Sequence, residues 1–171
     1  MKRGSTACAY AVAVATTVVL VGCTTSAPVY GLRPIDPQAR VELNGPRVVF
    51  VRVASLRPTL QWESFPTEDD RRADPEELLS RIRNVSYELK IFAAEHEFPA
   101  GLVYVRRGLS APSHTLDTWL KPSTNYFWTV RTRFELDGRT RVTPWGRIDR
   151  PWSTDLLVPS PFYYGLETPP K

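Results

Sequence analysis

Apolar and polar residues alternate along several short segments of the chain, and this alternation predicts β-strands. The segment 85–91 shows it most cleanly, because Val85, Tyr87, Leu89 and Ile91 are apolar and the residues between them are polar. Successive side chains of a strand point to opposite faces, so the pattern predicts a strand with one buried face. Similar β-branched and aromatic runs predict strands over 48–53, 59–63, 102–105, 115–119 and 125–136, with a last strand from Arg139.

Short strands separated by turn residues are typical of a β-sandwich, so we expect an all-β fold of about seven strands over residues 47–157. Asp137-Gly138 lies between two of the runs, and this pair favours a two-residue hairpin turn. The charged segment 67–84 departs from this pattern of short strands and turns. Asp74 followed by Pro75 suits the start of a helix, so we expect a short helix over 75–83, inserted between the second and third strands.

Composition narrows the classes further. The 171 residues are 42% hydrophobic, which is enough for one core and excludes a wholly disordered chain. Sixteen prolines against nine glycines disfavour a helical bundle. Two cysteines and two histidines exclude a disulfide-stapled scaffold and leave few ligands for a zinc site, so we expect no metal ion and no cofactor.

The N-terminal residues 1–22 have the features of a secretory signal. Lys2 and Arg3 precede a mostly apolar stretch that is short for a membrane-spanning helix. The stretch ends in Leu20-Val21-Gly22-Cys23, which resembles the lipobox of bacterial lipoproteins. The resemblance implies cleavage before Cys23 and lipid attachment at Cys23, which anchors the chain to a membrane; an ordinary signal peptide is the alternative. Several acyl chains give stable anchoring where a single one does not.

The lipoprotein resemblance also places the protein in the bacterial cell envelope. Thr24 follows the cysteine in place of an aspartate, which by resemblance to enterobacterial sorting patterns favours the outer membrane, facing the periplasm. Residues 23–46 carry four prolines and no periodicity, and we interpret them as an extended tether of about 60 Å at roughly 3 Å per residue. Cleavage removes Lys2 and Arg3, so the formal charge falls from +4 to +2, and we expect no nucleic-acid partner.

The run from Leu120 to Val130 resembles the fibronectin type III family. In that family a leucine, a proline two residues later and a tyrosine four residues after that mark a corner between two strands; here they are Leu120, Pro122 and Tyr126. The segments 58–62 and 87–91 resemble two further strands of the family. The resemblance implies an immunoglobulin-like sandwich in which the Tyr126 hydroxyl bonds the backbone a few residues upstream. It implies no particular activity.

Catalytic chemistry finds little support in the sequence. A hydrolytic nucleophile needs a base within reach, and His96 and His114 are the two imidazoles. We interpret both as surface side chains. The three residues Glu95-His96-Glu97 alternate between the faces of a strand and do not converge on a metal. Acidic residues of the segment 68–77 lie among arginines, which indicates a self-compensating, solvated loop. We expect no catalytic residues and no enzyme.

Binding is the remaining class. Strict alternation over 125–136 turns Phe127, Arg131 and Arg133 outward, and alternation over 85–92 turns Lys90 and Phe92 outward. The type III arrangement places these two strands side by side, so the five residues form a candidate interaction face of the aromatic and arginine composition common in hot spots. In the alternative, Glu88 and Lys90 pair with the arginines, and the phenylalanines are covered by the tail.

Two functions follow. The first is a non-catalytic lipoprotein whose sandwich docks on another envelope protein as a scaffold or interaction module. The second is a carbohydrate-binding module for peptidoglycan or a surface glycan, with Trp119, Trp145 and Trp152 as a stacking platform. The C-terminal tail, 158–171, carries Phe162, Tyr163 and Tyr164 among prolines; we expect it to cover the outward phenylalanines or to insert into a partner, and we expect no central strand there.

Overall fold

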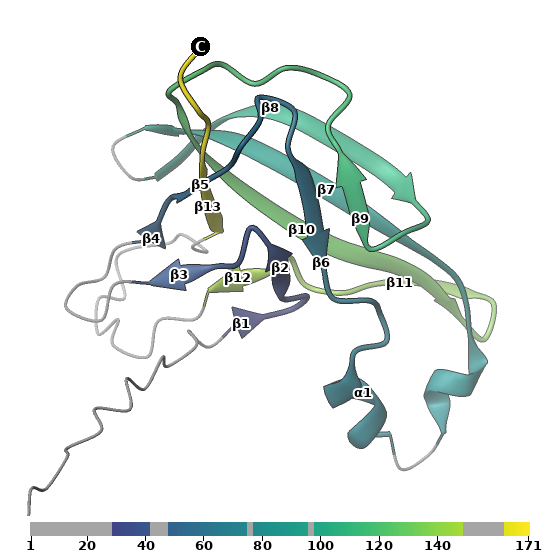
Figure 1. Cartoon of the computed structure of the whole chain (residues 1–171). Coiled ribbons are helices and arrows are strands. Elements are labelled where there is room, and N and C mark those ends of the chain that lie inside the picture. The colour runs from purple at the N-terminus through teal and green to yellow at the C-terminus, as the bar shows by residue number, and fades with distance from the viewer. Residues whose placement is uncertain (1–28, 42–47, 75–76, 96–97, 149–162) are drawn as a thin grey trace, which may run out of the picture.

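The computed structural model describes residues 29–41, 48–74, 77–95, 98–148 and 163–171 (Figure 1). The proposed signal peptide and Cys23 lie outside the described residues. Strands dominate the described part, with one short α-helix and one 3₁₀ helix. The strands form a sandwich-like arrangement, so the all-β prediction is confirmed.

The main sheet is the larger layer. Its strands run in the order β5-β13-β10-β7-β8, and β11 also pairs with β10. Every pairing is antiparallel except that of β13 with β5. The bounds are β5 Val51–Arg52, β13 Tyr164–Glu167, β10 Asn125–Leu136, β7 Ile82–Glu95, β8 Phe98–Leu109 and β11 Arg139–Val142.

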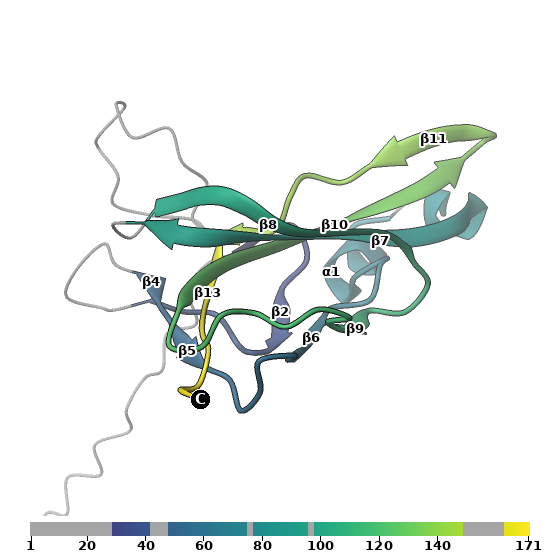
Figure 2. The ribbon, with the colours of Figure 1, turned by 90° about the horizontal axis from the view of Figure 1, so that it is seen from above.

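A smaller sheet, in the order β2-β6-β9, forms the second layer. Figure 2 shows the main sheet nearly edge-on with these strands along one of its faces. Two further strand pairs, β1 with β12 and β3 with β4, complete the described strands. The bounds are β2 Pro34–Asp36, β6 Thr59–Trp62, β9 Ser113–Thr115, β1 Val29–Tyr30, β12 Arg147–Ile148, β3 Arg40–Val41 and β4 Val48–Val49.

The hydrophobic core lies between the two layers. Trp62 of β6 packs edge-on against Tyr87 of β7, with ring centroids 5.6 Å apart. Trp128 of β10 packs in the same way against Tyr164 of β13, at 5.1 Å. The alternation predicted for 85–91 is confirmed, since Tyr87, Leu89 and Ile91 belong to this core. Buried aromatic pairs of this geometry stabilise the fold beyond the area that they bury.

The predicted corner and hairpin are both confirmed. The backbone N–H of Lys121 donates to the Tyr126 hydroxyl at 2.9 Å, which fixes the entry of the chain into β10. Asp137 and Gly138 take φ values of 53° and 72°, as a tight turn with two left-handed residues requires, and they join β10 to β11.

The helical insertion lies between β6 and β7 as expected, but its α-helix falls earlier than predicted. The helix α1 spans Glu68–Arg72, and Thr67 caps it through a reciprocal pair of bonds with Asp70. Asp74 accepts from the backbone N–H groups of Leu78 and Leu79, so it caps the 3₁₀ helix η1, Leu78–Arg81, in place of an α-helix over 75–83. The capping box at Thr67 was the stronger start signal.

The prediction of a tether over 23–46 is wrong for residues 29–41. Strands β1, β2 and β3 lie within it, and Leu32 is 2% exposed in the core. The Tyr164 hydroxyl donates to the Leu32 carbonyl at 2.7 Å, which ties this segment to the C-terminal strand. The domain therefore begins no later than Val29. The prolines favoured an extended tether, but Pro34 lies in a strand of three residues, which is too short to show a periodic pattern.

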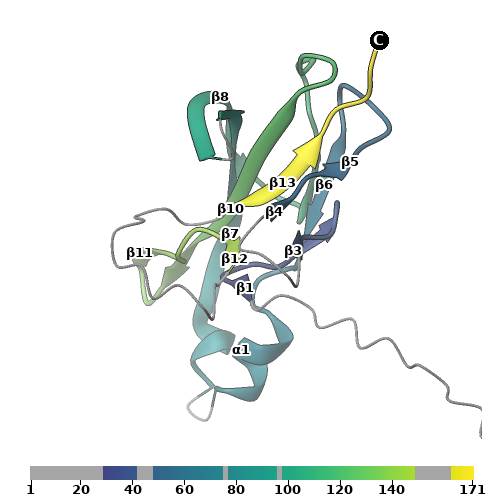
Figure 3. The same cartoon turned by 90° about the vertical axis from the view of Figure 1, so that its left-hand side faces the viewer.

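The prediction that the tail 158–171 holds no central strand is also wrong. Strand β13 lies between β10 and β5, and its residues Tyr164 and Leu166 are fully buried (Figure 3). The prolines bracket the strand without entering it, so its N–H groups remain free to pair. The 163–171 segment is part of the domain.

Candidate functional site

The candidate interaction face lies on the side of the main sheet that points away from β2, β6 and β9; we call it the outer face. The predicted neighbourhood of its two strands is confirmed, because β7 and β10 pair along most of their length. The pairing sets Phe92 opposite Phe127, Glu88 opposite Arg131 and Ser86 opposite Arg133. Directly opposed residues point to the same face, so the predicted residues do share one surface.

The two phenylalanines are not free for a partner, so the alternative in which they are covered is the one that the structure supports. Phe127 is 0% exposed, and the ring of Phe50 lies edge-on to it at 5.1 Å. Phe92 is half-buried and stacks on Tyr163, with ring centroids 5.5 Å apart and planes inclined by 15°. Of the tail aromatics, Tyr163 thus covers Phe92, Tyr164 enters the core, and Phe162 lies outside the described residues.

A buried carboxylate organises the charges of the outer face. Glu88 is 3% exposed, and its two oxygens accept from Arg107 at 2.8 Å and from Arg131 at 2.7 to 2.9 Å. Burial by itself would raise the pKa of Glu88, but hydrogen bonds and charge from the two arginines outweigh it and hold the pKa below its usual value. The carboxylate therefore stays ionised and fixes both guanidinium groups.

Trp145 was missed as a member of this face. Two cations lie over its ring, the Lys90 ammonium at 4.5 Å and the Arg131 guanidinium carbon at 4.3 Å from the ring centroid. The next residue holds the segment against β10: the Gly146 N–H donates to the Val130 carbonyl at 2.8 Å. A side chain at Gly146 would meet the Tyr164 hydroxyl at 2.6 Å, so glycine is required there. A glycine in the sequence indicates that another group packs closely against the backbone, but only the fold shows which group that is.

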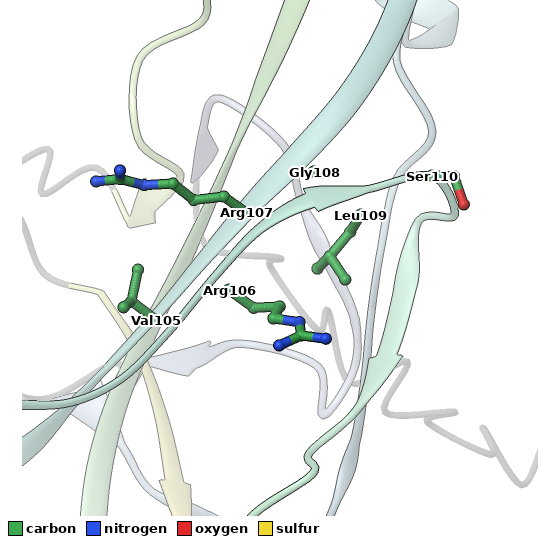
Figure 4. Close-up of a pocket in the computed structure, with 6 residues that line it drawn as sticks. All are labelled: Val105, Arg106, Arg107, Gly108, Leu109 and Ser110. Carbon is green, nitrogen blue, oxygen red and sulfur yellow. The ribbon is translucent and has the colours of Figure 1, made fainter.

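Exposed side chains surround this organised centre. Val105, opposite Lys90, is 44% exposed, and Arg133 and Val142 form an exposed pair opposite each other. Figure 4 shows Val105 and Arg107 pointing to one side of β8, while Arg106 and Leu109 point to the other. An open hollow of about 600 Å³ follows this end of β8, and Val105 to Ser110 line it.

The edge of β8 is not built to receive another strand. Its pairing with β7 shifts register three times, between Tyr87 and Leu89, between Ile91 and Phe92, and between Phe92 and Ala94. Bulges of this kind bend an edge strand and protect it from pairing with another chain. The side chains of β8, rather than its backbone, are therefore available for contacts.

His114 is half-buried and joins the two layers, which corrects its interpretation as a surface side chain. Its Nε2 lies 2.7 Å from the Tyr104 hydroxyl, and Arg106 pairs with Asp117 beside it at 3.4 Å. Burial lowers the pKa of His114, opposed by Asp117 and assisted by Arg106. Burial likewise raises the pKa of Tyr104. The arrangement suits a link between β8 and β9. His96 lies outside the described residues.

The described tryptophans do not form a common stacking platform. Trp119 is 71% exposed beside Arg57, in the loop after β9, whereas Trp145 lies against the outer face. Trp152 lies outside the described residues. The acidic residues of the insertion form ion pairs with nearby arginines, such as Arg72 with Asp69 and Arg33 with Asp69, which confirms a self-compensating surface.

Within the described ranges, no three His, Cys, Asp or Glu side chains gather to hold a metal ion. No helix in the same ranges has the length and apolar character needed to cross a membrane. Comparisons of the chain with protein-family models, with curated proteins and with solved structures found no match.

Proposed function

We propose that the protein is a non-catalytic lipoprotein of the bacterial cell envelope, anchored through lipid on Cys23, and that its sandwich docks on another envelope protein. The lipobox-like Leu20 to Cys23 behind a signal-like segment supports the anchor. The pattern Thr24 after Cys23 supports the outer membrane, with the domain in the periplasm.

One observation carries the docking proposal: the Lys90 ammonium and the Arg131 guanidinium group both lie over the Trp145 ring on the outer face. Tryptophan and arginine are enriched in binding hot spots. Because Glu88 fixes Arg131, these side chains lose little conformational freedom when a partner covers them. The exposed Val105 and Arg133 supply the apolar and polar surroundings of a docking patch.

Photo-crosslinking in living cells tests the docking face. A photoreactive amino acid is placed at Val105, at Arg133 and, as a control, at Gln61, which is exposed on β6 in the other layer. We expect the first two positions to give the same crosslinked protein and the control to give none. Crosslinks of equal yield at all three positions would contradict a specific face.

A matched pair of variants measures the contribution of the tryptophan. We expect Trp145→Ala to weaken binding of the crosslinked partner about tenfold or more, the loss typical of a hot spot. Trp119→Ala should leave the partner's affinity unchanged. Unfolding midpoints of both variants establish that the domain is intact. Equal affinity of Trp145→Ala and the wild type would remove the outer face from the proposal.

A carbohydrate-binding module is the second candidate, favoured by the exposed ring of Trp119 beside Arg57. In that case, isolated peptidoglycan should retain the wild-type protein, and Trp119→Ala, not Trp145→Ala, should abolish retention. Exposed aromatic rings bind sugars by stacking, so a change of this one ring distinguishes the two candidates.

The anchor is tested separately. Cys23→Ala should abolish incorporation of labelled palmitate and leave an uncleaved chain. If the variant is cleaved at the same site and fractionates with membranes as the wild type does, Cys23 is not the anchor.

A further inference from the structure

The first described strand begins very close to the proposed lipid site. Val29 opens β1, so five residues separate it from Cys23. A chain spans at most about 3.6 Å per residue when fully extended. Whatever the conformation of residues 24–28, Val29 therefore lies within about 22 Å of the α-carbon of Cys23, which is six residue steps away.

From Val29 onward the chain is held by the domain. Val29 pairs with Ile148, and Tyr30 pairs with Arg147. Two residues further, Leu32 is buried and its carbonyl accepts from the Tyr164 hydroxyl. If this segment left the domain to lengthen the tether, the β1–β12 pair would break and part of the core would be empty. The short distance from Cys23 is therefore a property of the folded state.

From these lengths we infer that the corner formed by β1 and β12 faces the lipid bilayer and that the domain rests beside the membrane surface. The inference rests on the proposed lipid attachment at Cys23. The occupant of this surface is the bilayer that carries the anchor, because residues 24–28 are too few to take Val29 far from a lipid-modified Cys23.

Two exposed residues near this corner, Arg33 and Ile35, add no uncompensated charge to it. Arg33 is paired with Asp69 at 2.7 Å and lies beside Glu63, so its charge is compensated within the domain. Ile35, on β2, is an apolar side chain that is 56% exposed. The short chain between Cys23 and Val29 therefore holds the corner near the bilayer, and exposed cations such as Arg147 of β12 are not required for it.

The opposite end of the domain supplies an internal reference. Figures 1 and 3 place the C-terminus at the upper end, away from β1. The loop between β9 and β10 lies at that end too, because the Ser123 N–H donates to the Pro169 carbonyl at 3.0 Å. Lys121 in this loop is exposed and serves as the distant position.

The test uses the full-length, lipid-modified protein reconstituted into vesicles of phosphatidylethanolamine and phosphatidylglycerol. Single variants Ile35→Cys and Lys121→Cys carry a fluorophore, and a fraction of the lipids carries a nitroxide on the headgroup. We expect strong quenching at position 35 and weak quenching at position 121. Mass spectrometry establishes the lipid on Cys23 in each sample.

A spacer supplies the control. Twenty-four Gly and Ser residues inserted between Ser26 and Ala27 add a root-mean-square reach of about 27 Å. Quenching at position 35 should then fall to the level of position 121. Equal quenching at both positions in the lipid-modified chain without the spacer, or no response to the spacer, overturns the inference while the anchor stands. A chain without lipid on Cys23 instead contradicts the proposed function itself.

Discussion

A single hydroxyl group holds the corner at which the chain enters β10. Tyr126 is buried, and its oxygen accepts from the Lys121 N–H. Tyr126→Phe removes the acceptor and leaves that donor unsatisfied, so we expect a loss of about 1–3 kcal/mol in the free energy of unfolding. Urea denaturation measures it, with an unchanged slope. Tyr163→Phe is the control, because Tyr163 contributes its ring to Phe92 and should tolerate the change. Equal midpoints for all three proteins would remove the corner from the account of stability.

His114 should make the domain sensitive to mild acid. Burial lowers its pKa in the folded state, while the unfolded chain keeps an ordinary value near 6.5. Below that pH the unfolded chain binds more protons, so stability falls as the pH decreases through about 6.5 towards the folded pKa. The slope should be less than about 1.4 kcal/mol per pH unit, the limit for one proton.

Unfolding experiments between pH 7.5 and 5.5 test the histidine. This window lies above the range in which carboxylates titrate, and Glu88 in particular stays ionised because its pKa is lowered. His114→Gln should flatten the dependence on pH. An unchanged slope in that variant would assign the effect to another group.

At the scale of elements, β13 is the piece whose removal should cost most. It fills the position between β5 and β10, and Tyr164, Leu166 and Thr168 are fully buried. Deleting 164–171 opens both neighbours and the core, so we expect loss of cooperative unfolding, a change of the order of the 5–15 kcal/mol that holds a domain together. Circular dichroism during thermal unfolding measures it. Deleting only the exposed Pro170 and Lys171 is the control and should leave the transition in place.

The long strands could be predicted from the sequence because their information is local. Alternation marks the buried residues of β7, and the β-branched and aromatic run over 125–136 coincides with β10. Asp137-Gly138 specifies its turn by backbone conformation alone. The predicted side-by-side placement of Lys90 and Arg131 followed from these two strands and is confirmed by their register.

The remainder depends on contacts between distant segments. Strand β13 has four residues, and its parallel pairing sets Leu166 opposite Val51, which no local pattern encodes. Alternation turned Phe127 outward correctly, but it could not show that Phe50 covers that face in the space that Gly165, opposite Phe127, leaves open. Trp145 joins Lys90 and Arg131 only because the segment after β11 returns along β10.

For the whole molecule, the true N-terminal limit of the domain can be measured. We compare chains that begin at Thr24 and at Arg47. The second lacks β1, β2 and β3, so it loses Leu32 from the core and leaves the buried Tyr164 hydroxyl without its acceptor. We expect the chain from Arg47 to be less stable by at least about 3 kcal/mol.

Urea unfolding of the two chains checks this limit. Equal stability would return residues 29–41 to the role of a tether. The flexible chain between Cys23 and the domain would then be longer. This result would argue against the proposed position of the domain at the bilayer.

The position of β13 in the main sheet determines when the domain can fold. A ribosome delivers the chain from its N-terminus, and β13 emerges after the other described strands of the main sheet. Until then β5 and β10 lack the strand that joins them, and the surface that Tyr164 and Leu166 fill stays open. The core therefore cannot close before β13 has emerged, and until then the exposed apolar surface is prone to aggregation, which a chaperone would prevent. A chain that lacks residues 164–171 would therefore be a substrate for proteolysis rather than a shortened but working domain.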